Sequence, residues 1–131
     1  MKSSIRESLK DDGILHTTVM SEEMFDKYDK LVLAGLAREY FGSILFSRGA
    51  MSQQEFVARA IAELTEVKQG TRQFEELVKN LTRSVKKLSE WGLLDLKEYE
   101  VKLTAWGSSV ANSISKEEYE RIKAEVRGRR R

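Results

Sequence analysis

The chain has 131 residues, of which 40% are hydrophobic and 34% charged, and this composition fits one globular domain with its own core. The formal net charge is +2, yet the last eleven residues carry six basic side chains against one carboxylate. The rest of the chain is therefore net acidic. This excludes a uniformly basic protein and confines positive charge to local surfaces.

Residue types that several chemistries require are absent. There is no cysteine, which excludes disulfides, thiolate metal sites and thiol nucleophiles, and His16 is the only histidine. No glycine-rich phosphate loop is present, and the acidic pairs fall at expected helix ends, where they complement the helix dipole. We expect no enzyme, no metal and no cofactor. No membrane span or signal-peptide core is seen, so a cytoplasmic protein without a membrane partner is expected.

The first twenty residues form an expected N-terminal arm. Ser4 and Glu7 have the spacing of a capping box, and Gly13 closes a short helix. The following run 14–20, ILHTTVM, is rich in β-branched residues and indicates a strand or an extended link.

A longer helix is predicted to begin at Ser21, whose hydroxyl can cap free amides. Its second half is apolar nearly all round, with apolar positions extending to Ile44 and Leu45, so it should lie at the centre of the core. Gly35 and Gly42 are costly in a helix and indicate either close helix packing or a break near Gly42.

Three further helices are marked by N-cap signals. Ser52 opens a helix from residue 53 to about 68, and Thr104 can cap a helix over 105–114. Ser115 has Glu118 at capping-box spacing and opens a final helix through about residue 126.

The residues after Thr71 predict one amphipathic helix, which Thr71 can cap and Gly92 ends. Its buried stripe recurs at spacings of three and four: Phe74, Leu77, Val78, Leu81, Val85 and Leu88. Its opposite side is basic. That side is either a solvated helix face or a row that meets phosphates. The candidate nucleic-acid-binding residues are Arg72, Lys79, Asn80, Arg83, Lys86 and Lys87.

Beyond Gly92 the apolar period changes to two. This predicts a short hairpin with its tip at Lys97 and Glu98, and its strands carry Leu94, Leu96, Tyr99, Val101 and Leu103. The hairpin is slightly acidic and therefore poorly suited to phosphate. Trp91 and Trp106 bracket it, and we expect packing rather than base stacking from both. The terminal GRRR is either a frayed tail or a nucleic-acid-touching arm.

The run from Phe74 to Gly107, with LSEWGLL and LTAWG, resembles winged-helix domains. The continuation LTAWGSSVANSISKEEYERI resembles the exit of the winged-helix domain of archaeal Ski2-type superfamily 2 helicases, where a Thr-x-x-Gly-x-x-Val pattern leaves the wing. Thr104, Gly107 and Val110 match that pattern, and the resemblance covers about residues 31–126. The ATP-binding motifs of the helicase motor are absent. The resemblance therefore implies an isolated accessory domain, or a free-standing relative of one; in that family the winged helix packs against the motor domains and shapes a nucleic-acid channel.

The expected fold is mainly α: a winged helix-turn-helix with a short β-hairpin wing, an N-terminal helical extension and a C-terminal helix. Its expected parts are an arm at 1–20, a winged-helix domain at 21–114, and a C-terminal helix with a basic tail at 115–131. We expect a non-catalytic module that serves as an accessory domain of a Ski2-type helicase. It should bind nucleic acid, with DNA as the expected ligand, and this binding should be weak and salt-dependent. The alternatives are a stand-alone dimeric winged-helix transcriptional regulator, and a protein-docking module.

Overall fold

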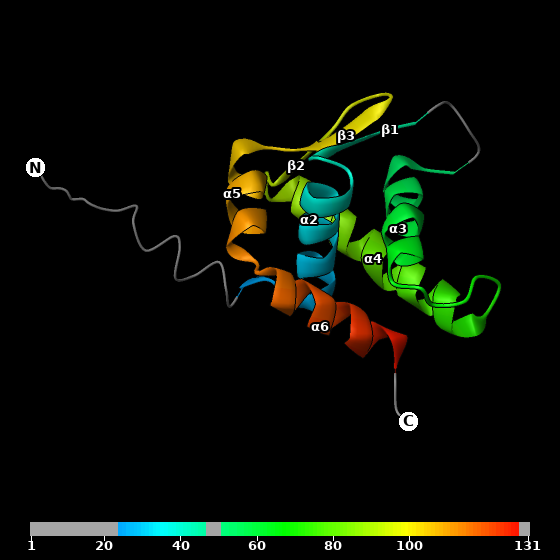
Figure 1. Cartoon of the computed structure of the whole chain (residues 1–131). Helices are drawn as coiled ribbons and strands as arrows, with labels where there is room; N and C mark the ends of the chain where they lie inside the picture. Colours follow the sequence, from blue (N-terminus) through cyan, green and yellow to red (C-terminus); the bar gives the residue numbers. More distant parts are fainter. Residues whose placement is uncertain (1–23, 47–50, 129–131) are drawn as a thin grey trace, which may run out of the picture.

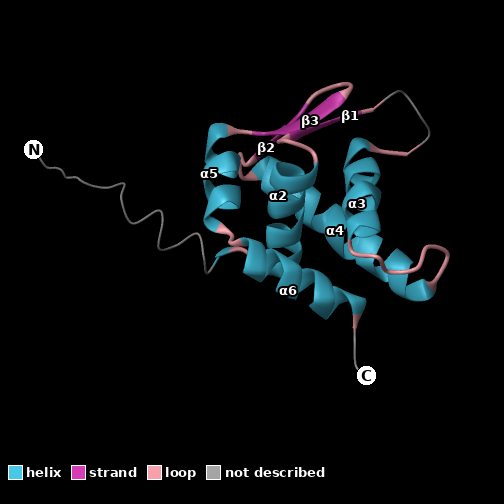
Figure 2. Ribbon diagram, viewed as in Figure 1, coloured by secondary structure: helices cyan, strands magenta, loops and turns pink. Residues whose placement is uncertain are grey.

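The computed structural model describes residues 24–46 and 51–128, so the arm at 1–20, Ser21 and the last three arginines lie outside the described residues. The described part is mainly helical with a small antiparallel sheet, which confirms the mainly α prediction (Figures 1 and 2). Its elements in chain order are α2 (Lys27–Glu39), β1 (Ser43–Leu45), α3 (Gln53–Leu64), α4 (Arg72–Glu90), β2 (Leu94–Leu96), β3 (Glu100–Leu103), α5 (Ala105–Ser113) and α6 (Lys116–Arg127). None of these helices is long and apolar enough to cross a membrane.

Helix α2 is the centre of the core, as predicted. Its side chains from Leu31 to Leu36 are buried, and the helix contacts α3, α4, α5 and α6 (Figure 2). Gly35 permits the close approach to α3, because a Cβ there would lie 2.9 Å from Ile61 Cδ1 and 3.3 Å from Leu64 Cδ1. Close packing at Gly35 is thus confirmed.

The beginning of α2 differs from the prediction. The N-cap is Asp26, whose backbone is extended, so a helix cannot run unbroken through this residue. Asp26 Oδ1 accepts from the amide of Asp29 at 2.9 Å, and Asp29 Oδ2 accepts from the amide of Asp26 at 3.0 Å. This reciprocal capping box satisfies two helix-end amides and fixes the start of α2 after the predicted position.

The end of α2 also differs. The predicted break near Gly42 is confirmed, but the assignment of Ile44 and Leu45 to the helix was wrong, because both belong to β1. The physical reason is a turn in which Phe41 and Gly42 have positive φ angles of 56° and 99°. Successive left-handed residues stop the helix and turn the chain back toward the sheet.

The sheet has the order β1–β3–β2, with both pairs antiparallel. The predicted hairpin is confirmed by the pairing of Leu94 with Leu103, although Tyr99 lies in the turn instead of the strand. Strand β1, which the sequence did not predict, pairs Ile44 with Val101. β1 therefore forms one edge of the sheet.

The predicted N-caps are confirmed at the start of four helices. The hydroxyls of Ser52, Thr71, Thr104 and Ser115 each accept from the amide three residues later, at 3.0–3.1 Å. Helix α3 ends at Leu64, short of the predicted end, because Glu66 takes a positive φ of 70°, which a right-handed helix does not allow.

The exit from the hairpin into α5 has little freedom for substitution. A Cβ at Gly107 would lie 2.1 Å from the Leu93 carbonyl oxygen, so α5 approaches the backbone just before β2 too closely for any other residue. The Thr104 hydroxyl donates to the Gly92 carbonyl at 2.7 Å while it caps α5, and Val110 is buried. All three residues of the Thr-x-x-Gly-x-x-Val pattern therefore have packing roles.

Helix α6 joins the same core as the preceding elements. Tyr119 and Ile122 are buried, and α6 contacts α2. The Gln73 side chain of α4 donates to the carbonyls of Val126 and Arg127 at 3.2 and 2.8 Å, which holds the end of α6 beside the start of α4.

Candidate nucleic-acid interface

The predicted division of α4 into a buried and an exposed face is confirmed. All six residues of the apolar stripe are buried, whereas Arg72, Lys79, Arg83 and Lys86 are exposed. At 100° and 1.5 Å per residue, these cations lie within an arc of about 60° and over about 21 Å of helix. We call these four residues the cationic row.

The side chains of the cationic row form few polar contacts inside the molecule. Arg83 Nη1 donates to Asn80 Oδ1 at 3.1 Å, which is a local bond to a neutral amide. Within the described part of the chain, none of the four cations forms a salt bridge. Their charge is therefore available to a ligand.

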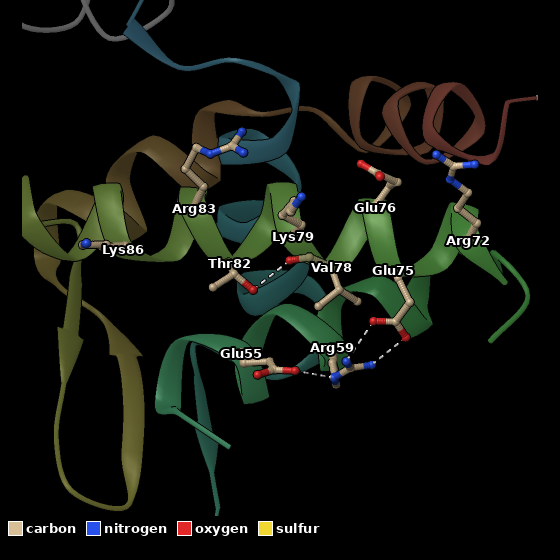
Figure 3. Close-up of a pocket in the computed structure, with 10 residues that line it drawn as sticks. All are labelled: Glu55, Arg59, Arg72, Glu75, Glu76, Val78, Lys79, Thr82, Arg83 and Lys86. Carbon is tan, nitrogen blue, oxygen red and sulfur yellow. Dashed lines mark hydrogen bonds and ion pairs between the residues drawn. The ribbon is translucent and has the colours of Figure 1, made fainter. Parts of the chain in front are cut away.

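The cationic row borders a groove between α3 and α4 with a volume of ≈ 550 Å³, the cationic groove (Figure 3). The groove is also lined by Glu76, Val78, Thr82 and three residues that bond to one another: Glu55, Arg59 and Glu75. Figure 3 shows Arg83 and Arg72 on the side of α4 away from α3, whereas Glu75 points toward Arg59. Glu75 is thus turned toward α3, whereas Glu76 lies on the same side of α4 as Arg72.

Arg59 offsets part of the charge of Glu55 and Glu75. Its Nη1 and Nη2 donate to Glu75 at 3.3 and 3.0 Å, and its Nε donates to Glu55 at 3.0 Å. The hydrogen bonds to Glu75 and then to Glu55 raise the pKa of Arg59. These bonds from the Arg59 guanidinium join α3 to α4. Glu55 and Glu75 are therefore paired with Arg59 and not with the cationic row.

Lys87 has a different role from the rest of the candidate set. Its Nζ lies 2.6 Å from Oδ2 of the fully buried Asp29 and 5.0 Å from the centre of the Trp91 ring. Asp29 Oδ1 has no hydrogen-bond partner in the structure, so Lys87 provides the main compensation for a buried charge. The sequence suggested Lys87 through its adjacency to Lys86, and the Asp29 contact was not foreseen.

Little of the exposed face of α4 can distinguish bases. Asn80 Oδ1 already accepts from Arg83, and this bond competes with the paired oxygen and nitrogen contacts by which an amide recognises adenine. The Thr82 hydroxyl donates to the Val78 carbonyl at 2.7 Å, and Ser84 is buried. The exposed face of α4 therefore offers mainly positive charge and few groups for base recognition.

The β2–β3 hairpin and α6 add little positive charge. Lys97 lies 3.7 Å from Asp95 on the hairpin. In α6, Arg121 pairs with Glu118 and Glu125, Lys123 pairs with Glu120, and Arg127 donates to the Thr65 carbonyl. The hydrogen bond from the Gln53 side chain to the Lys97 carbonyl shows that the hairpin tip lies beside the start of α3. The cationic row is thus the largest group of exposed cations without an ion-pair partner among the described residues.

The two tryptophans pack against neighbours. The Trp91 ring lies 6.0 Å from the Phe25 ring, although 39% of the residue is exposed, and Trp106 packs against the core. The Lys87 ammonium also covers Trp91. No group of three or more potential metal-ligating side chains occurs in the described ranges.

Comparison of this chain with family models, with curated proteins and with solved structures finds no match.

Proposed function

We propose that the chain is a non-catalytic winged-helix module that associates with nucleic acid through phosphate contacts made by α4. The observation that carries the proposal is the cationic row, four exposed cations on one face with no internal acid partner. The order α2–β1–α3–α4–β2–β3 and a hairpin directly after the basic helix support the winged-helix assignment.

Binding through this surface is expected to be weak, salt-dependent and largely independent of sequence. Phosphate contacts give affinity without base information, and the polar groups beside the cationic row are engaged internally. DNA is the first ligand to test, and RNA offers the same phosphate chemistry.

An accessory role within a Ski2-type helicase remains our specific proposal for the biological setting. It is supported by the residues of the Thr-x-x-Gly-x-x-Val pattern, which pack the hairpin exit against the chain just before β2 and lead into α5 and α6. Motor domains would then be the partner. A stable dimer in sedimentation, with tight and sequence-selective binding, would instead support a transcriptional regulator.

The direct test is fluorescence anisotropy with a short labelled duplex across a salt series. For three to four phosphate contacts, the slope of log affinity against log salt should be about −2.7 to −3.6, a loss of roughly 40- to 150-fold between 50 and 200 mM salt. A second duplex of equal composition but scrambled sequence should bind within about twofold. No binding at low salt, or binding that ignores salt, would disprove phosphate association through α4.

A further inference from the structure

A second groove lies on α3 next to the cationic groove and has a volume of ≈ 380 Å³; we call it the apolar groove. Its lining is mainly apolar and comes from the end of α2, from β1 and from α3: Tyr40, Ile44, Leu45, Met51, Phe56 and Ala60. Arg59 and Glu63 supply its charged groups, and Arg59 also lines the cationic groove.

Two large apolar side chains near this groove are left in solvent. Leu45 of β1 is 74% exposed, and Phe41, in the turn before β1, is 94% exposed. Single exposed apolar residues are common, but a pair beside a groove with an apolar floor marks an interaction surface.

The conformation of Phe41 strengthens this interpretation. Its φ of 56° lies in the left-handed region, which is costly for an aromatic residue and free for glycine. The helix end is closed by the Gly42 amide, which donates to the Leu36 carbonyl at 2.8 Å and does not need a ring at position 41. Stability alone would favour glycine there, so the exposed ring indicates a binding role.

The backbone of β1 offers a second feature for a partner. The Leu103 amide donates to the Gly42 carbonyl at 2.8 Å, and the Phe46 amide donates to the Tyr99 carbonyl at 3.0 Å. Because these bonds alternate along an antiparallel pair, the N–H and C=O of Leu45 face the open edge of the sheet. An extended segment can hydrogen-bond to this edge beside the groove.

The charge around the apolar groove is negative. Burial raises the pKa of the Tyr40 hydroxyl, and the nearby carboxylates of Glu63 and Glu39 raise it further. Glu63 forms no salt bridge in the described ranges, whereas Arg59 is committed to Glu55 and Glu75. The groove is therefore complementary to a basic ligand.

We propose that the apolar groove docks an extended peptide segment of another protein, with an apolar side chain over Tyr40 and Phe56 and a flanking Lys or Arg at Glu63. This site is separate from the phosphate-binding face and does not depend on it.

The test uses amide NMR spectra of the whole chain titrated with two synthetic peptides. Both have a Val-Leu-Val centre; one is flanked by lysines and its twin by glutamates. The lysine peptide should shift the amide signals of Leu45, Ala60 and Glu63 at millimolar concentration, and the glutamate twin should not. Absence of shifts, or equal shifts with both peptides, would overturn the proposal.

Phe41→Gly separates binding from folding. It relieves the left-handed backbone, so the thermal midpoint should rise by a few degrees, while affinity for the lysine peptide falls about tenfold. Leu45→Thr places a β-branched residue of good strand propensity in β1 and should also weaken binding. Unchanged peptide affinity in both variants would refute the site. Sedimentation that shows a dimer abolished by Phe41→Gly would assign the surface to a second copy and equally overturn the proposal.

Discussion

The two grooves on α3 differ in almost every property except the helix they share. The cationic groove is bordered by exposed Lys and Arg side chains of α4, while the apolar groove has an aromatic and aliphatic floor with Glu63 at its rim. Arg59 stands between them and lines both. The difference shows how a formal net charge of +2 can contain two surfaces of opposite character.

The arrangement of Arg59 explains how these surfaces stay distinct. Its bonds draw Glu55 and Glu75 toward α3 and offset part of their charge at the cationic groove, and the same bonds offset the Arg59 charge at the apolar groove. One ion-pair cluster therefore makes one groove more positive and the other more negative. The two surfaces should respond differently to every substitution that follows.

The largest expected effect is on the cationic groove alone. The combined substitutions Lys79→Glu, Arg83→Glu and Lys86→Glu should lower duplex affinity at 50 mM salt by at least about 100-fold, because they replace phosphate contacts with repulsion. Affinity for the lysine peptide should stay unchanged. Anisotropy and NMR titration measure the two affinities.

A matched control reverses the same amount of charge elsewhere. Lys27 and Lys116 open α2 and α6, and Lys68 is exposed in the loop before α4, so glutamate is tolerated at all three. This control should keep most of the duplex affinity. If it loses as much as the α4 variant, binding reflects overall charge and the cationic row has no special role.

The next effect distinguishes two adjacent lysines of α4. Lys87→Met leaves the buried Asp29 without its cation and should reduce the free energy of unfolding by about 2 kcal/mol, below the range for fully buried pairs because Lys87 is 32% exposed. Lys86→Met should leave stability within about 0.5 kcal/mol and reduce the salt slope by about 1. Urea unfolding and a salt series of the duplex titration measure both quantities. The reverse assignment of the two effects would contradict the separation of Lys87 from the cationic row.

Local signals in the sequence were sufficient for much of this fold. The serine and threonine caps, the Gly92 stop and the division of α4 into two faces depend on residues within a few positions of each other, and the structure confirms them. The same signals identified the exposed cations Arg72, Lys79, Arg83 and Lys86. That these cations bind phosphate stays a prediction.

What the sequence did not reveal depends on distant contacts. Strand β1 exists because Ile44 pairs with Val101, and Lys87 is committed because folding brings it to Asp29. Each partner is more than fifty residues away, so no periodicity or spacing in one segment could indicate it. The apolar groove was missed for the same reason, since it is assembled from the end of α2, from β1 and from α3.

The smallest expected effect has opposite signs at the two grooves. Arg59→Met releases the charges of Glu55 and Glu75 into the cationic groove and removes a cation from the apolar groove. Duplex affinity should fall about twofold while affinity for the lysine peptide rises about twofold, with a loss of stability of at most about 1 kcal/mol because the pair is partly exposed. Arg59→Lys keeps the charge but loses the bidentate fork, so it should leave both affinities close to their original values. Changes of the same sign for both ligands would show that Arg59 acts through the packing of α3 on α4, and the electrostatic separation of the two grooves would then be wrong.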